Sequence, residues 1–201
     1  RSGNKSVLVG GDVQGNVVKG AGEAPGVIGN VALPVKRARP QKVQIVGVQH
    51  ADDDLVKDSP GWQWVPELIP AADERLLHKQ FNSCFEHTPL DEELAKLGVT
   101  HIVLAGCATN WCIRATAYGA LERGYDLTLI KDAHTTKTLE LENGMKLEAA
   151  TLVEDLNIAM TWLSYPGRKN TTATAKAVEF YGEGGKPVSY THLTLPTSDL
   201  V

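Results

Sequence analysis

The chain has 201 residues, of which 42% are hydrophobic and 22% charged, a composition that predicts one globular, soluble domain with a substantial core. A net charge of −4 and a pI near 5.9 exclude the basic surface typical of nucleic-acid-binding proteins. No apolar run approaches the length of a membrane span. Three cysteines cannot all pair and no early apolar segment suggests a signal peptide, so we expect a cytoplasmic protein.

Strand-like and helix-like segments alternate along the chain. Apolar or β-branched runs predict extended segments over 6–9, 42–49, 75–81, 102–105 and 126–132. Helical patterns cover 27–39, 89–97, the segment from 109 onward and 144–164. The first of these helices should be poor, because Gly29 and Pro34 interrupt it.

This alternation predicts an α/β fold, a three-layer sandwich whose mostly parallel β-sheet is covered by helices on both faces. No internal repeat and no linker divides the sequence, so we expect one domain over residues 5–182. Residues 188–201 resemble translated sequencing-adapter read-through and are excluded from the fold prediction.

The segment 102–116 carries the strongest chemical signal. Its apolar run breaks at Gly106, and a helix is predicted to begin at Thr109, a good N-cap residue. Cys112 then falls in the first helical turn, where free N–H groups and the positive end of the helix dipole favour a thiolate. Such a cysteine can act as a nucleophile. Taken by itself, however, the segment fits a small buried cysteine in an ordinary strand–helix unit even better.

Two further residues stand where other strands end. Asp12 follows the first strand, and Lys79 lies in the segment 75–81. In an open parallel sheet, residues just past the carboxyl ends of the strands gather in one crevice. There Asp12 could take the thiol proton of Cys112, and Lys79 could favour the thiolate. An aspartate in a turn and a lysine in a surface ion pair are the ordinary alternatives.

At this point the chain resembles the isochorismatase-like cysteine hydrolases, from residue 7 to about residue 168. The resemblance is carried by five segments, 12–14, 61–68, 78–81, 106–116 and 132–136. It implies a Rossmann-like sheet and a catalytic triad of Asp12, Lys79 and Cys112. It also implies a cis peptide before Ala108, which aims the backbone N–H groups of Ala108 and Cys112 at the substrate oxygen as an oxyanion hole.

Within that family the segment 62–68 is most similar to amide-cleaving members, including streptothricin hydrolases. The resemblance therefore implies cleavage of an amide or lactam C–N bond of a small molecule through a Cys thioester, with no cofactor. Gln14, Trp62 and Phe81 are candidates to line the pocket, although a turn amide and ordinary aromatic core are the alternatives. Relatives commonly assemble, so we expect a homo-oligomer.

The resemblance also bears on metal binding. Nicotinamidases of the same family hold a metal with an Asp-x-His…His cluster, and the segment 48–52 does not reproduce it. We therefore expect no metal. The acidic run 52–54 should lie near the crevice, where it either attracts cationic substrates or is simply a solvated loop.

Two other functions remain open at this stage. One is an isochorismatase-type vinyl-ether hydrolase, against which the presence of Cys112 argues. The other is a catalytically decayed thiol or redox protein in which Cys107 and Cys112 pair. Gly10 and Gly11, which replace bulky apolar residues before Asp12, would suit such a protein, as would Pro34.

Overall fold

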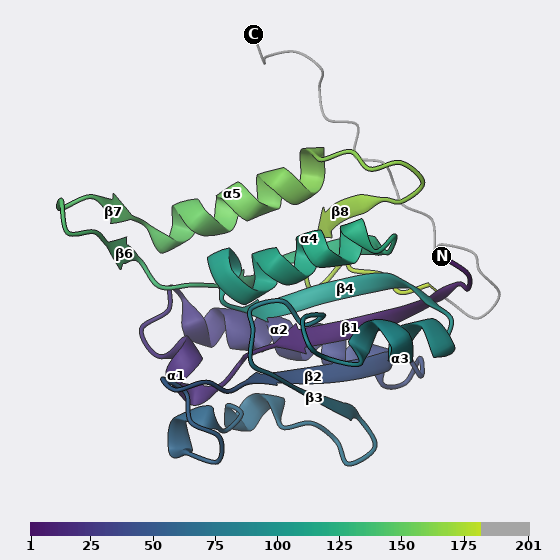
Figure 1. The fold of residues 1–201 in the computed structure, drawn as a ribbon, viewed down its shortest axis with the longest axis horizontal. Coiled ribbons are helices and arrows are strands. Elements are labelled where there is room, and N and C mark those ends of the chain that lie inside the picture. Colours follow the sequence, from purple (N-terminus) through teal and green to yellow (C-terminus); the bar gives the residue numbers. More distant parts are fainter. Residues whose placement is uncertain (182–201) are drawn as a thin grey trace, which may run out of the picture.

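The computed structural model describes residues 1–181, which form a six-stranded β-sheet with helices on both faces (Figure 1). The strands follow the order β3-β2-β1-β4-β5-β8, and all neighbouring strands are parallel. Their bounds are β1 (Lys5–Gly11), β2 (Gln44–His50), β3 (Arg75–Lys79), β4 (Val99–Cys107), β5 (Asp126–Thr135) and β8 (Asn170–Ala173). The predicted α/β fold is confirmed. Residue 182, the expected domain end, and the segment 188–201 lie outside the described residues.

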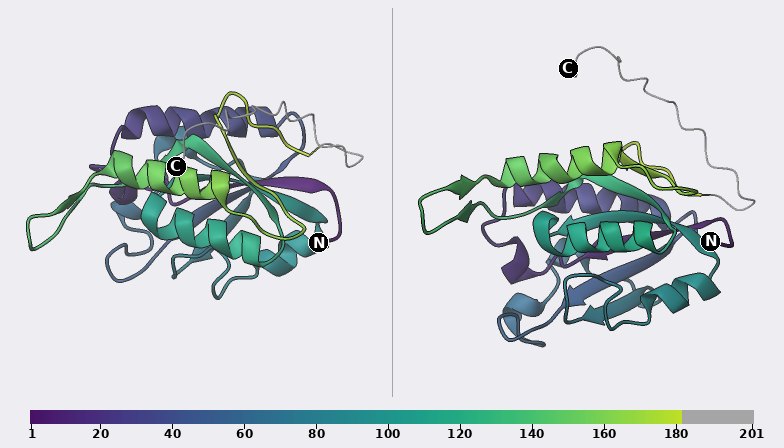
Figure 2. Two further views of the ribbon diagram at one scale, coloured as in Figure 1. Left: turned by 90° about the horizontal axis from the view of Figure 1, so that it is seen from above. Right: turned by 45° about the horizontal axis from the view of Figure 1, so that its top comes forward.

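Helices cover the two faces of the sheet unequally. One face packs against α2 (Ala24–Ala38) and the segment 175–180, and the other packs against α3, α4 and α5 (Figure 2). The remaining bounds are α1 (Gly15–Val18), α3 (Leu90–Lys96), α4 (Arg114–Glu122) and α5 (Ala149–Trp162), with single turns η1 (Pro60–Trp62), η2 (Pro66–Leu68) and η3 (Thr109–Ile113). Within residues 1–181, no helix has the length and apolar character needed to cross a membrane.

The apolar run of the central strand β1 does not alternate with polar residues, because both faces of this strand are buried. Val7 and Val9 belong to the core under α3, α4 and α5, whereas Leu8 belongs to the core under α2. All three side chains are almost completely buried. A strand covered on both faces needs apolar residues at every position, as in other parallel sheets.

Helix α2 continues through Pro34, so the predicted interruption is wrong. A proline inside a helix lacks one N–H and costs about 3 kcal/mol. Here Val31, Pro34 and Ala38 stand at i, i+3 and i+7 and are all buried. Burial of this face against the sheet offsets the local cost, because each buried CH₂ group contributes about 0.8 kcal/mol.

In the second half of the chain, the structure differs from the sequence-based prediction at two more places. Helix α5 begins five residues later than predicted, because β6 (Leu139–Glu140) and β7 (Lys146–Leu147) form a small antiparallel hairpin before it. This hairpin projects from the body in Figure 1. Strand β8 was not predicted, since its sequence is polar and short; it pairs with β5 at the edge of the sheet, where its side chains stay half-exposed.

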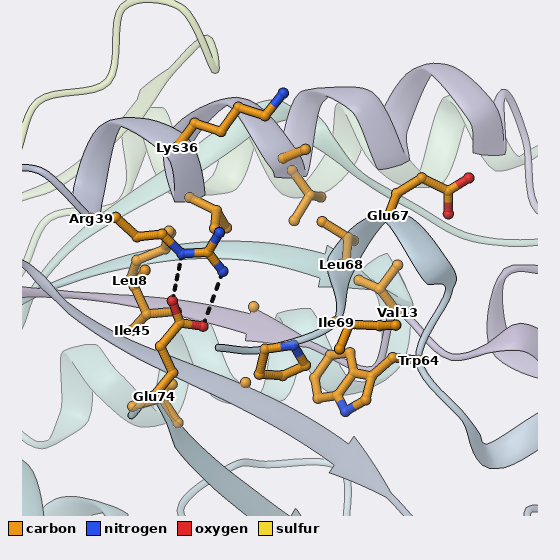
Figure 3. A pocket seen from close by; sticks show the side chains of 17 residues that line it. Leu8, Val13, Lys36, Arg39, Ile45, Trp64, Glu67, Leu68, Ile69 and Glu74 are labelled. Atoms are coloured by element: carbon orange, nitrogen blue, oxygen red, sulfur yellow. Dashed lines mark hydrogen bonds and ion pairs between the residues drawn. The ribbon is translucent and has the colours of Figure 1, made fainter. Parts of the chain in front are cut away.

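An apolar cavity of about 80 Å³ lies between α2, β1 and the η2 turn. Figure 3 shows Leu8 and Trp64 beside it, and the ion pair of Arg39 with Glu74 at 2.6 Å near one end. The candidate catalytic residues do not line it. Gly10 does, and a Cβ added there would meet no atom within 4 Å.

We expect Gly10→Ala to stabilise the protein. Alanine restricts the unfolded chain and adds one methyl group to open space, so about 1 kcal/mol should be gained, with a Tm rise of roughly 2–4 °C. Thermal unfolding followed by circular dichroism measures this. The matched control is Gly47→Ala, whose Cβ would lie 3.1 Å from Trp64 Cη2 and should destabilise. Equal shifts in both variants would contradict the cavity argument.

Candidate active site

Asp12, Lys79 and Cys112 meet at the carboxyl edge of the sheet. Lys79 Nζ lies 2.9 Å from Asp12 Oδ2 and 3.2 Å from Cys112 Sγ. The side chains of Asp12 and Lys79 are buried, whereas Cys112 is partly exposed. The predicted grouping of an acid, a cation and a thiol is therefore present in the structure.

The strand order produces this meeting. Asp12 directly follows β1, Lys79 is the last residue of β3, and Cys112 follows β4. Parallel strands end at the same edge, and β2, which separates β1 from β3, ends there with His50. Asp12 has φ of +53°, a left-handed conformation that aspartate tolerates better than most residues.

The turn that carries the thiol is built on a glycine and a cis peptide. The Cys107–Ala108 bond is cis, as the family resemblance implied. Gly106 has φ of +124°, and a Cβ there would collide with the backbone of Gly11, so only glycine fits. Thr109 does not cap the helix; residues 109–113 form a π-helical turn in which Ile113 N–H donates to the Ala108 carbonyl, and α4 follows. Such turns are frequent at functional sites.

The electrostatics favour a protonated thiol in the free protein. Burial raises the pKa of Cys112, and the Asp12 carboxylate raises it further, while Lys79 opposes both. For Lys79, burial lowers the pKa, but the negative charge of Asp12, with that of Cys112 whenever the thiol ionises, raises it above its usual value. Burial and Asp12 together exceed the effect of the single ammonium, so the pKa of the Cys112 thiol lies above its usual value.

Comparisons with known proteins identify the family of the chain. A family model described as the isochorismatase domain matches residues 6–153. The chain belongs to the isochorismatase family. A streptothricin hydrolase from Streptomyces noursei is 32% identical over 55% of this chain and 45% of that relative. A maleamate amidohydrolase from Pseudomonas putida is 37% identical over 39% of this chain and 37% of that relative. The chain thus spans less than half the length of these curated relatives.

Solved structures of the isochorismatase family have the same fold. An isochorismatase from Pseudomonas putida matches with a TM-score of 0.77 at 22% identity, over 87% of this chain and 90% of that one. A cysteine hydrolase from Pseudomonas syringae matches with a TM-score of 0.76 at 18% identity, over 85% and 89% of the two chains. At these identities the likeness establishes the fold.

His50 was missed as a candidate site residue because the segment 48–52 was considered only for metal binding. Its Nδ1 lies 3.0 Å from Lys79 Nζ, and its Nε2 lies 2.6 Å from Asp52 Oδ2. The carboxylate of Asp52 is therefore engaged rather than free, and its pKa is lowered by the hydrogen bond to His50. A histidine at the end of β2, between the strands that lead to Asp12 and Lys79, is a signal that could have identified it.

The three predicted pocket residues lie in different surroundings. Gln14 is buried, and its amide bonds the backbone N–H and carbonyl of His50 and the carbonyl of Trp62, so it supports the site instead of lining a pocket. Trp62 is also buried and stacks on His78, while its Nε1 has no hydrogen-bond partner among the described residues. Phe81 is 45% exposed, and its carbonyl accepts from Lys79 Nζ at 3.0 Å.

An open hollow lies beside the thiol. Asn82, whose Oδ1 is 3.8 Å from Cys112 Sγ, forms part of it. Its other lining residues are Asn110, Trp111, Arg114, Ala115 and Tyr118. Trp111, Arg114 and Tyr118 follow one side of the turn and helix after the cis peptide. The hollow offers aromatic surface, amide groups and one cation.

Buried polar residues support the turn 109–113, which carries Cys112, through hydrogen bonds. His134 bonds Thr109 Oγ1 and Asn157 Oδ1, each at 2.8 Å, and Thr136 Oγ1 donates to Asn110 Oδ1 at 2.6 Å. Burial lowers the pKa of His134, so the ring is neutral near pH 7. The family resemblance includes segment 132–136, but this supporting role could not be read from its sequence.

The donor atoms of Asp12, His50 and Cys112 all lie within 4.8 Å of one another, a set whose chemistry suits a zinc ion. However, Lys79 Nζ stands within 3.2 Å of an atom of each of these residues. A metal cation at their centre would share its space with a like charge. The donor set therefore fits a metal poorly while Lys79 is in place.

Proposed function

We propose that this protein is a cysteine amidohydrolase that cleaves a C–N amide or lactam bond of a small molecule through a thioester on Cys112. The observation that carries the proposal is the contact of Lys79 Nζ with both Asp12 and Cys112. The names of the two curated relatives, a streptothricin hydrolase and a maleamate amidohydrolase, support this class of substrate. A vinyl-ether hydrolase would not need the thiol.

The proposed reaction has two halves. Asp12 takes the Sγ proton as the sulfur attacks the amide carbon, and the N–H groups of Ala108 and Cys112 stabilise the oxyanion. The tetrahedral intermediate collapses, the C–N bond breaks, and Asp12 gives the proton to the leaving amine. Asp12 then takes a proton from water as that water attacks the thioester, and the proton returns to sulfur when the acid product leaves. Lys79 stays charged throughout.

A panel of amides, lactams and nicotinamide tests the proposal. Amine release is measured by colorimetry, and intact-mass spectrometry of quenched samples looks for an acyl group on Cys112. Turnover of an amide with the expected mass increase supports a thioester. Turnover of a vinyl ether without any protein adduct would favour the vinyl-ether hydrolase. If none of these reactions occurs and oxidation joins Cys107 to Cys112 in a disulfide, a redox protein would be favoured.

We further expect Arg114 to select substrates that carry a carboxylate. It is exposed, it is the charged residue of the hollow beside Cys112, and it makes no ion pair within the described part of the chain. Arg114→Gln should raise KM about 10-fold or more for an acidic amide such as maleamate, since a charge-assisted hydrogen bond is lost. KM for a neutral amide should not change. Equal changes in both would contradict this role.

A further inference from the structure

Three hydrogen bonds connect the backbone of β5 to the turn 109–113, and their directions follow from the end that lies on β5. The Lys131 carbonyl can only accept, so the group that bonds it at 3.1 Å is Nδ2 of Asn157. Asn157 Oδ1 is then the atom that lies 2.8 Å from His134 Nε2, and it must accept. The neutral His134 ring therefore carries its proton on Nε2, and its bare Nδ1 accepts from the Thr109 hydroxyl at 2.8 Å.

His134 reaches this position through an irregularity in β5. Leu104 of β4 pairs with Leu129, but Gly106, two residues further along β4, pairs with His134, five residues further along β5. With regular pairing, Lys131 would stand opposite Gly106 instead. Bulges in strands are frequent beside active sites, where they re-aim a side chain. This bulge places a neutral histidine, rather than a lysine, beside the start of the turn.

No side chain caps this turn at its start. Ala108, the residue before the turn, has an extended backbone and makes no capping hydrogen bond. Thr109 follows and is completely buried, and its hydroxyl bonds His134 rather than the backbone of the turn. The two proposed oxyanion-hole donors, the N–H groups of Ala108 and Cys112, lie on either side of Thr109 in the chain. A contact that holds Thr109 therefore acts on both donors.

We propose that His134 is a positioning residue for the oxyanion hole. Its Nδ1 holds Thr109, and the N–H groups on either side stay aimed at the substrate oxygen. The inference rests on the proposed function, because an oxyanion forms only when the thiol attacks a carbonyl. Oxyanion-hole donors act in the transition state, so a looser turn should slow acyl transfer rather than weaken substrate binding. Misplacement by about 1 Å can cost on the order of 10²-fold in rate.

Two reagents that attack the same sulfur test this without knowledge of the natural substrate. p-Nitrophenyl acetate acetylates Cys112 through an oxyanion, whereas iodoacetamide alkylates it without one, and intact mass follows both reactions. Thr109→Val removes the hydroxyl and keeps the branched side chain. We expect it to be acetylated about 10- to 100-fold more slowly than wild type, with alkylation unchanged. Thr109→Ser, which keeps the hydroxyl, should recover most of the rate.

Thr128→Val is the matched control. Thr128 Oγ1 also lies 2.8 Å from Nε2 of a buried histidine, His101, but near the amino end of β5. Thermal unfolding should show similar losses of stability in both valine variants, whereas only Thr109→Val should be acetylated slowly. Equal slowing of acetylation in both variants would overturn the proposal. Unchanged acetylation of Thr109→Val, or parallel slowing of its acetylation and alkylation, would overturn it as well.

Nitrogen-15 NMR of the wild-type protein tests the same arrangement without a change in the turn. The ring signals of His134, assigned by their absence from the His134→Gln spectrum, should show a protonated Nε2 and a bare Nδ1 at pH 7. The opposite tautomer would overturn the proposal. The panel of amides remains a separate test. If all these results hold and no amide is turned over, the proposed amidohydrolase function fails while the role of His134 stands.

Discussion

Cys112→Ala should abolish amide hydrolysis, with a fall in kcat on the order of 10⁶-fold, while the fold stays intact. The sulfur forms the bond to the substrate carbon in the proposed mechanism, and no neighbouring group can replace it. The fold should survive because Lys79 keeps its ion pair with Asp12 and its hydrogen bonds to His50 and to the Phe81 carbonyl. Amine release and thermal unfolding measure the two effects.

Cys107→Ala is the matched control for the nucleophile. Its side chain is 1% exposed and packs with Val13, Val18 and Val65, away from the ammonium. Burial raises the pKa of the Cys107 thiol to about 12, so this group is inert near neutral pH. The variant should keep most of the activity and lose only about 1–2 kcal/mol of stability from the small cavity. If Cys107→Ala were as inactive as Cys112→Ala, the hypothesis of a redox protein in which Cys107 and Cys112 pair would be favoured.

Asp12→Asn should separate hydrolysis from thiol reactivity. The carboxylate is the proposed general acid and base, so kcat should fall at least 10²- to 10⁴-fold. At the same time one cause of the high pKa of Cys112 disappears, since after burial the Asp12 charge contributes most to the upward shift. The thiol should then ionise at lower pH, and iodoacetamide should alkylate the inactive variant faster than wild type at pH 8. General damage to the site would slow both processes.

Lys79→Met should shift the alkylation of Cys112 by iodoacetamide in the opposite direction to Asp12→Asn. Lys79 lowers the pKa of Cys112, so removing its charge should move alkylation to still higher pH. An alkylation profile that responds alike to loss of the anion and loss of the cation would show that neither charge acts on the sulfur. The pair of variants therefore tests the assignment of both residues at once.

The mostly parallel sheet and the grouping of Asp12, Lys79 and Cys112 could be predicted, because parallel strands must end at one edge and apolar runs mark where they end. The upward shift of the Cys112 pKa could not be predicted, because it depends on how deeply the folded chain buries the thiol. Gln14 was misplaced for a related reason, because a buried amide that bonds three backbone groups has the same sequence as one that faces a ligand. Polar β8 was missed because its pairing comes from β5, a neighbour distant in sequence.

The position of Lys79 among Asp12, His50 and Cys112 makes it a tethered cation. A metal ion at such a position must bind from solution, so the occupancy of the site would depend on the metal concentration, on competing ions and on chelators. An ammonium on the polypeptide arrives with folding and cannot be exchanged. Every folded molecule therefore carries its positive charge at full occupancy, and the charge balance of the site is set at synthesis rather than by the composition of its surroundings.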